Sequence, residues 1–181
     1  LAEAALEAGA DPVAIIEQGL AVGLQAVSDR YSCGEAYLPE LMLAGETADA
    51  VVKVLEPVLQ ASGGQRTMRG RIVIGTVKGD IHDIGKKIVS MMWQEVIDIG
   101  IDVPAEVFVA KVRELQPDIV GASAMITTTV GEQKVVAEAL AAAGVRGQVK
   151  YMIGGAAVSP QWAAESGADA FADNAVAAVE K

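Results

Sequence analysis

Five short runs of apolar and β-branched residues, each followed by a stretch with helical spacing, dominate the sequence after residue 70. Strands that alternate with helices can pair in parallel, because each helix carries the chain back across the sheet. The pattern therefore predicts an α/β fold, a doubly wound five-stranded parallel sheet with right-handed crossovers. The predicted strands are 72–77, 95–99, 119–123, 149–153 and 168–172, and the predicted helices are 84–94, 104–115, 129–143, 160–165 and 174–181.

The first sixty residues have helical periodicity instead. Asp11 before Pro12 is a capping residue followed by proline at the first helical position. Pro39 opens a second helix, and Pro57 is expected to bend or end it. Apolar residues recur at helical spacing in both segments, at Ile16, Leu20, Leu24 and Val27, and at Leu41, Ala44, Ala48, Val52, Leu55 and Leu59. We expect a small helical bundle.

Residues 61–70 interrupt the periodicity with small, polar and basic residues, as is typical of a linker between domains. The sequence therefore predicts a helical domain over residues 1–65 and an α/β domain over residues 71–181.

Composition narrows the classes of function. Hydrophobic residues make up 52% of the 181 residues and the formal net charge is −10, which argues against disorder and against binding to nucleic acid or anionic membranes. Uncharged stretches are too short to span a bilayer. A single cysteine, Cys33, rules out an internal disulfide, and no signal-peptide pattern is visible, so we expect a cytoplasmic protein.

The loop after the first predicted strand holds the only histidine, His82, between Asp80 and Asp83. A phosphate-binding loop is disfavoured, because Gly79 and Gly85 enclose five residues rather than four and no hydroxyl residue follows the next lysine. A divalent-metal site lacks the further neutral ligand that zinc usually has. The remaining local interpretation is a loop histidine that is hydrogen-bonded to Asp80.

Two further loops at the carboxyl ends of predicted strands change this assessment. One contains Ser123-x-Met125 and the other Gly154-Gly155. With Asp80-x-His82-x-x-Gly85, these pieces resemble the Asp-x-His-x-x-Gly, Ser-x-Leu and Gly-Gly signature of cobalamin-binding domains, which have a flavodoxin-like or Rossmann-like sheet. Residues 34–42 similarly resemble the helical cap that precedes this domain in corrinoid proteins of methyltransferase systems. Two departures are Met125 in place of leucine and a shortened interval after Gln94, where we expect that residues of a turn are absent from the chain.

The resemblance implies a cobalamin or related corrinoid cofactor with His82 as the ligand of cobalt. It implies that Asp80 accepts the other ring N–H of His82 and that Thr129 stands behind the carboxylate, so that the three residues can pass a proton. Tyr37, Leu38, Leu41 and Met42 are implied as the cover of the upper corrin face, although the bundle core is an alternative place for them. The further cofactor contacts that it implies are Gly85, Ser123, Met125, Thr127, Gly154 and Gly155.

The resemblance also implies a function, a methyl carrier in anaerobic one-carbon metabolism that is not catalytic alone. Its partners would be a substrate-specific methyltransferase, an acceptor methyltransferase acting on tetrahydrofolate or coenzyme M, and a reductive activation protein. The donor would be methanol, a methylamine or an aromatic methyl ether. Three alternatives stay open: a cobalamin-dependent regulator or sensor, the small subunit of a B12-dependent mutase, and a flavin-binding electron carrier, which leaves His82 unexplained.

Overall fold

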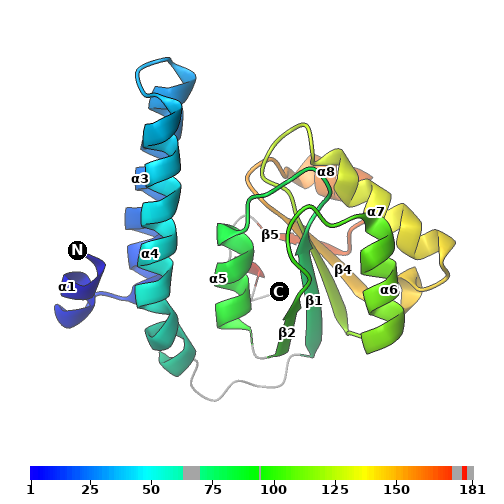
Figure 1. The fold of residues 1–181 in the computed structure, drawn as a ribbon. Coiled ribbons are helices and arrows are strands. Elements are labelled where there is room, and N and C mark those ends of the chain that lie inside the picture. Colours follow the sequence, from blue (N-terminus) through cyan, green and yellow to red (C-terminus); the bar gives the residue numbers. More distant parts are fainter. Residues whose placement is uncertain (63–69, 94, 173–176, 179–181) are drawn as a thin grey trace. The chain divides into compact units, whose positions relative to one another are not determined.

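The computed structural model describes residues 1–62, 70–93, 95–172 and 177–178 (Figure 1). The chain divides into two compact units, residues 1–65 and residues 66–181. Residues 63–69 of the predicted linker and Gln94, where we expected a missing turn, lie outside the described residues, as does most of the predicted last helix. That each of the two predicted domains folds independently stays a prediction.

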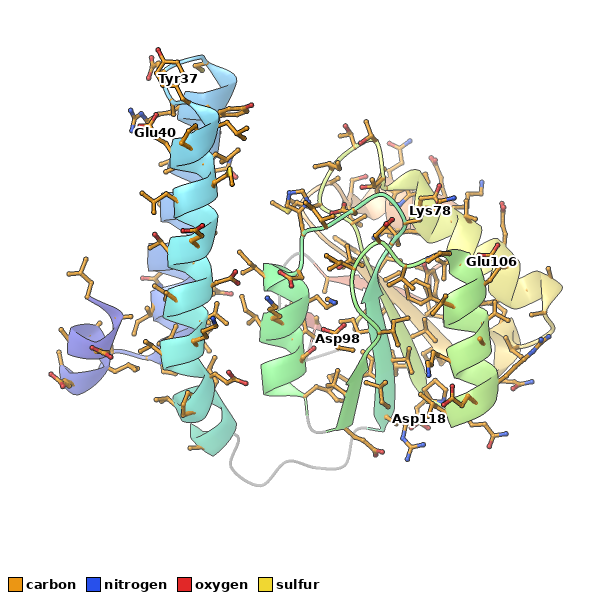
Figure 2. The ribbon with its side chains drawn as sticks, viewed as in Figure 1. Tyr37, Glu40, Lys78, Asp98, Glu106 and Asp118 are labelled. Carbon is orange, nitrogen blue, oxygen red and sulfur yellow. The ribbon has the colours of Figure 1, made fainter. Side chains whose placement is uncertain are left out.

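The first unit is helical. Its elements are α1 (Ala2–Glu7), α2 (Pro12–Ala14), the π-helical segment η1 (Ile15–Leu20), α3 (Ala21–Ser32) and α4 (Leu38–Ser62). Asp11 caps the second helix as predicted, because its carboxylate accepts the backbone N–H of Ala14. At the start of α4, the backbone N–H of Tyr37 donates to the Glu40 carboxylate at 2.8 Å (Figure 2).

The predicted apolar stripes are buried only in part, since Leu20, Leu24, Val27, Leu41 and Ala44 are half-buried. Ala48, Val52, Leu55 and Leu59 of α4 are buried, and so is Ile16 of η1. The prediction for Pro57 is wrong in one respect, since α4 continues through it to Ser62. Pro57 is exposed, so water can reach the carbonyl oxygen that lacks its helical N–H partner.

The second unit contains the predicted five-stranded sheet. Its strands are β1 (Arg71–Thr76), β2 (Glu95–Asp98), β3 (Ile119–Ser123), β4 (Lys150–Gly154) and β5 (Ala170–Ala172), and they lie in the order β2-β1-β3-β4-β5. Every pairing is parallel. The predicted fold class is confirmed, and each strand begins and ends within two residues of its predicted range.

Helices cover the two faces of the sheet. These are α5 (Ile84–Met92), α6 (Ala105–Leu115), α7 (Gly131–Ala142) and α8 (Pro160–Glu165), with a short 3-10 turn, η2 (Arg146–Gln148), before β4. Figure 1 shows α5 on one face and α6 and α7 on the other. Each face has its own buried cluster, with Ile72, Ile74, Val89 and Met152 on the α5 face and Phe108, Val120, Leu140 and Tyr151 on the other. The carboxyl ends of the strands are thereby held in one row.

Charge is distributed unevenly between the units. Residues 1–65 contain ten acidic and two basic side chains, whereas the other 116 residues contain 14 acidic and 12 basic ones. The helical unit therefore carries most of the net charge of −10. Among the described helices, none has a long enough apolar stretch to cross a bilayer.

Candidate functional site

The loop after β1 is anchored to the loop after β2. Val77 forms a parallel bridge with Val103, and the backbone N–H of Gly79 donates to the Asp102 carboxylate at 2.7 Å. The N–H of Asp102 in turn donates to the carbonyl oxygen of Asp80 at 2.9 Å. Gly79 has a φ of +78°, which favours glycine at this turn. These bonds fix the backbone from which His82 projects.

Asp80 is buried and accepts four hydrogen bonds. Its Oδ1 accepts the backbone N–H of His82 at 3.0 Å and faces the ring Nδ1 of His82 at 2.7 Å. Its Oδ2 accepts the backbone N–H of Met125 at 2.8 Å and the hydroxyl of Thr129 at 2.6 Å. One carboxylate therefore joins the loop after β1 to the loop after β3.

These donors keep Asp80 ionised. Burial raises its pKa, but the Thr129 hydroxyl, the backbone N–H groups of His82 and Met125, and the His82 ring together outweigh burial and lower the pKa to about 2. A carboxylate in this state can only accept hydrogen bonds, so the His82 Nδ1 must carry the proton. In the neutral imidazole this leaves the lone pair on Nε2.

The His82 ring is half exposed, with 48% of its side chain accessible, and Nε2 has no partner among the described residues. The Thr76 hydroxyl donates to the His82 carbonyl oxygen at 3.0 Å and fixes the backbone. The arrangement therefore offers an oriented, neutral nitrogen ligand backed by a carboxylate, as metal-bound histidines commonly are. It does not offer a divalent-ion site, because both oxygens of Asp80 are engaged. In the described part of the chain no three His, Cys, Asp or Glu side chains gather around a common point.

The loop after β3 presents apolar side chains to solvent close in sequence to the Asp80 contacts. Met125 and Ile126 are exposed, as is Ile81 beside His82. Thr127 is also exposed, whereas Thr129 is buried in the turn that leads into α7. Exposed apolar side chains on the two loops that Asp80 joins suit a ligand with an apolar face.

Gly154 and Gly155 hold the loop after β4 close to the loop after β3. The N–H of Ala124 donates to the Gly154 carbonyl oxygen at 3.0 Å. Gly155 has a φ of +118°, and a Cβ there would lie 1.9 Å from the Ala124 carbonyl oxygen. Only glycine allows this approach.

Small side chains line the α5 face of the sheet near these loops. Strand residues alternate between faces, so Ser123 and Gly154 share the face of Met152 and Ala172, which lies under α5. The Ser123 hydroxyl has no hydrogen-bond partner among the described residues, and Gly85, at the start of α5, borders open space. This surface therefore offers a hydroxyl without a partner and a glycine at which no side chain fills the space. With His82, it fits the corrinoid that the sequence implies.

The structure therefore brings most of the predicted site residues to one edge of the sheet. Asp80, His82 and Thr129 are in direct contact, and the Met125 backbone joins them. Leu41 and Met42 lie in the helical unit, where Leu41 is half-buried and Met42 is exposed. Tyr37 and Leu38 are exposed as well, so the alternative that they form the bundle core is wrong.

Sequence reasoning missed Gln133, which is fully buried next to the site. A signal for it exists, because Gln133 begins the apolar series Val136, Ala137 and Leu140 on one side of α7. A polar residue at the first position of such a series is a candidate for a buried hydrogen-bonding role.

Comparisons with known proteins agree with this geometry. Two family models, each described as a B12 binding domain, match residues 70–180 and residues 1–56. The trimethylamine corrinoid protein 2 of Methanosarcina acetivorans is 46% identical over 184 residues, which cover 99% of this chain and 85% of the relative.

Two solved structures are also similar. The monomethylamine corrinoid protein of Methanosarcina barkeri has a TM-score of 0.89 at 34% identity, covering 99% of this chain and 86% of that one. A chain of the methanol:cobalamin methyltransferase complex MtaBC from the same organism has a TM-score of 0.58 at 32% identity, covering 98% of this chain and 69% of that one. The resemblance predicted from the sequence is confirmed, and the chain belongs to the B12-binding corrinoid proteins.

Proposed function

We propose that this protein carries a methyl group on the cobalt of a bound corrinoid within a methylamine methyltransferase system. The names of its relatives support a methylamine as the methyl donor, with trimethylamine first, because the trimethylamine corrinoid protein shares 46% identity over almost the whole chain. When bound, the corrinoid supplies the methyl-transfer chemistry, since its cobalt can accept and release a methyl group.

The observation that carries the proposal is the orientation of His82. Asp80 holds the proton on Nδ1, and so Nε2 is the atom that would bind cobalt. Nε2 is also the ring atom through which a proton could enter or leave the set of His82, Asp80 and Thr129. The Thr129 hydroxyl donates to the other oxygen of Asp80 and would stabilise the carboxylate with and without bound cobalt.

The remaining roles follow from position. Gly85, Ser123, Met125, Thr127, Gly154 and Gly155 would contact the corrin ring or its nucleotide tail. Ser123 has the free hydroxyl for the buried base, and Gly155 keeps the adjoining loops close together. Leu41 and Met42, with Tyr37 and Leu38, would cover the upper face of the corrin.

The proposed protein is a subunit that is not catalytic alone. We propose that a substrate-specific methyltransferase loads it, that a second methyltransferase unloads it to tetrahydrofolate or coenzyme M, and that an activation protein reduces it after accidental oxidation. The similarity to a chain of a methanol:cobalamin methyltransferase complex supports a stable complex with such a partner. A reducing compartment, the cytoplasm, suits cobalt that must be kept reduced.

The test is His82→Ala, with Lys78→Ala as the control from the same loop, since Lys78 is exposed (Figure 2). Purified protein that contains ¹⁵N-labelled histidine is titrated without oxygen with cob(II)alamin, whose cobalt has an unpaired electron, and is followed by visible absorption and electron paramagnetic resonance. We expect the wild type and Lys78→Ala to show hyperfine coupling to a protein nitrogen, and His82→Ala to lose that coupling and to bind at least about tenfold more weakly.

Unchanged nitrogen coupling in His82→Ala would overturn the proposed ligand, and wild-type protein that stays colourless would overturn the proposed cofactor role. The donor is tested separately by methyl transfer from trimethylamine, dimethylamine, monomethylamine and methanol with their respective methyltransferases. Transfer from methanol alone would contradict the proposed methylamine system.

A further inference from the structure

Gln133 joins the carboxyl-terminal ends of β3 and β4. Its Nε2 donates to the carbonyl oxygen of Ala122 at 3.0 Å and to that of Gly154 at 3.0 Å. Its Oε1 accepts the indole N–H of Trp162 at 3.0 Å. The side chain is fully buried, so these bonds form away from water.

The chemistry of its partners fixes the orientation of this amide. Backbone carbonyl oxygens can only accept and an indole N–H can only donate, so the two amide hydrogens must point to the sheet and the amide oxygen to Trp162. The Tyr151 hydroxyl donates to the Gln133 carbonyl oxygen at 2.7 Å and holds the first turn of α7 against the sheet. The amide of Gln133 is therefore fully paired, and its orientation is determined by its three partners.

The bond to Gly154 lies where β3 and β4 end. There the Gly154 carbonyl oxygen accepts two hydrogen bonds, one from the backbone N–H of Ala124 and one from the Gln133 amide of α7. The amide adds a side-chain bond to each of the two strands at the end of their ladder, where Ser123 pairs with Gly154. Ser123 and Gly154 face the other side of the sheet, where the nucleotide tail of a corrinoid would lie.

We infer that Gln133 is a positioning residue for the tail of the corrinoid, acting through the backbone of Ala122 and Gly154 without touching the ligand. This inference rests on the proposed function. Binding of the tail would then depend on a residue of α7, on the face of the sheet opposite to the surface that contacts the tail. Gln133 itself donates to neither Asp80 nor His82, whose contacts are with the loop that contains them, Met125 and Thr129.

The test compares a corrinoid that has a nucleotide tail with one that lacks it. Cobinamide has the corrin ring and cobalt but no nucleotide tail, so it can use His82 and cannot use the surface near Ser123 and Gly154. Affinities of the full-length protein for cobalamin and cobinamide are measured by absorption titration. We expect Gln133→Met, which keeps the length of the side chain but has no amide, to weaken cobalamin binding about tenfold more than cobinamide binding.

Tyr151→Phe is the matched control. It removes a buried hydrogen bond from the same residue and leaves both amide donors of Gln133 in place. We expect it to lower the melting temperature without changing the ratio of the two affinities. Gln133→Leu serves if the methionine variant does not fold, since it is uncharged and also lacks the amide donors.

A readout without ligand is hydrogen exchange at the Ala124 N–H, which donates to Gly154. We expect faster exchange at Ala124 in the Gln133 variants and not in Tyr151→Phe. Equal weakening of cobalamin and cobinamide would reduce Gln133 to a structural residue and overturn the inference, as would unchanged binding of both. Wild-type protein that binds neither compound would instead overturn the proposed function, so the two failures are distinguishable.

Discussion

At the scale of single residues, the site depends on how one carboxylate distributes its four hydrogen bonds. Asp80 uses Oδ1 for the loop that contains it and Oδ2 for the loop after β3, 45 and 49 residues further along the chain. An uncharged side chain cannot replace it, because asparagine has one acceptor oxygen and would turn its amide toward two donors.

We predict that the contribution of Asp80 to stability depends on pH. The pKa of its carboxyl is lowered from 3.8 to about 2 in the folded protein, so the contribution is complete above pH 4 and is lost as the pH falls toward 2. A shift of this size corresponds to about 2 kcal/mol in the free energy of unfolding. The measurement is urea unfolding of wild type and Asp80→Asn between pH 2.5 and pH 6. The difference between the two should shrink at low pH, and a difference that is constant over this range would contradict the prediction.

How much of the site the sequence predicts depends on the kind of residue. The contact between Asp80 and His82 could be predicted from their spacing in one loop, whereas the place of Thr129 was implied by the resemblance to cobalamin-binding domains. Their roles toward a corrinoid stay predictions. Gln133, Thr76 and Asp102 were missed, because a polar side chain in a loop or helix has the same signature in a sequence whether it faces water or a buried carbonyl group.

At the scale of elements, the effect of a proline on a helix depends on its position in that helix. Two prolines in α4 show this. Pro39 lies in its first turn, where the missing N–H has no helical partner to lose. Pro57 lies inside the helix, where it deprives a carbonyl oxygen of its donor.

We predict that Pro57→Ala raises the free energy of unfolding of the helical unit by about 1–3 kcal/mol, because it restores a helical hydrogen bond at an exposed position. Pro39→Ala is the control and should change stability by less than about 1 kcal/mol. Thermal unfolding followed by circular dichroism measures both. A loss of stability in Pro57→Ala would show that the proline is required for the shape of α4.

Strands were predicted more accurately than the details of the helices. Strands in parallel sheets are buried on both faces, so their apolar runs are distinct from the helices beside them, and all five were predicted within two residues. The π-helical turn at Ile15–Leu20 was not predicted, because its apolar spacing of four residues also suits an ordinary helix. The continuation of α4 past Pro57 was missed because exposure to solvent, which makes the proline tolerable, is set by tertiary packing.

At the scale of the whole molecule, the two units differ in size, in architecture and in charge. The sheet unit has two buried clusters and pairs its strands within itself. The helical unit is about half as long and carries most of the negative charge. Units with separate cores are expected to fold separately.

We predict that a fragment of residues 66–181 folds on its own, with the circular dichroism of an α/β protein and a single cooperative transition in urea. The control is the full-length chain, which should show an unfolding transition at the same urea concentration as the fragment. A fragment that unfolds without cooperativity would show that the sheet unit requires the helical unit and would contradict the two predicted domains.

Cys33, which is exposed directly after α3, gives this protein a practical advantage. It is the sole thiol in the chain, so a maleimide dye or a nitroxide attached there labels one known point of the helical unit without prior mutagenesis. A second probe on an engineered cysteine near His82 would then report, by energy transfer or dipolar spectroscopy, whether the distance between the two units changes when corrinoid or a methyltransferase is added.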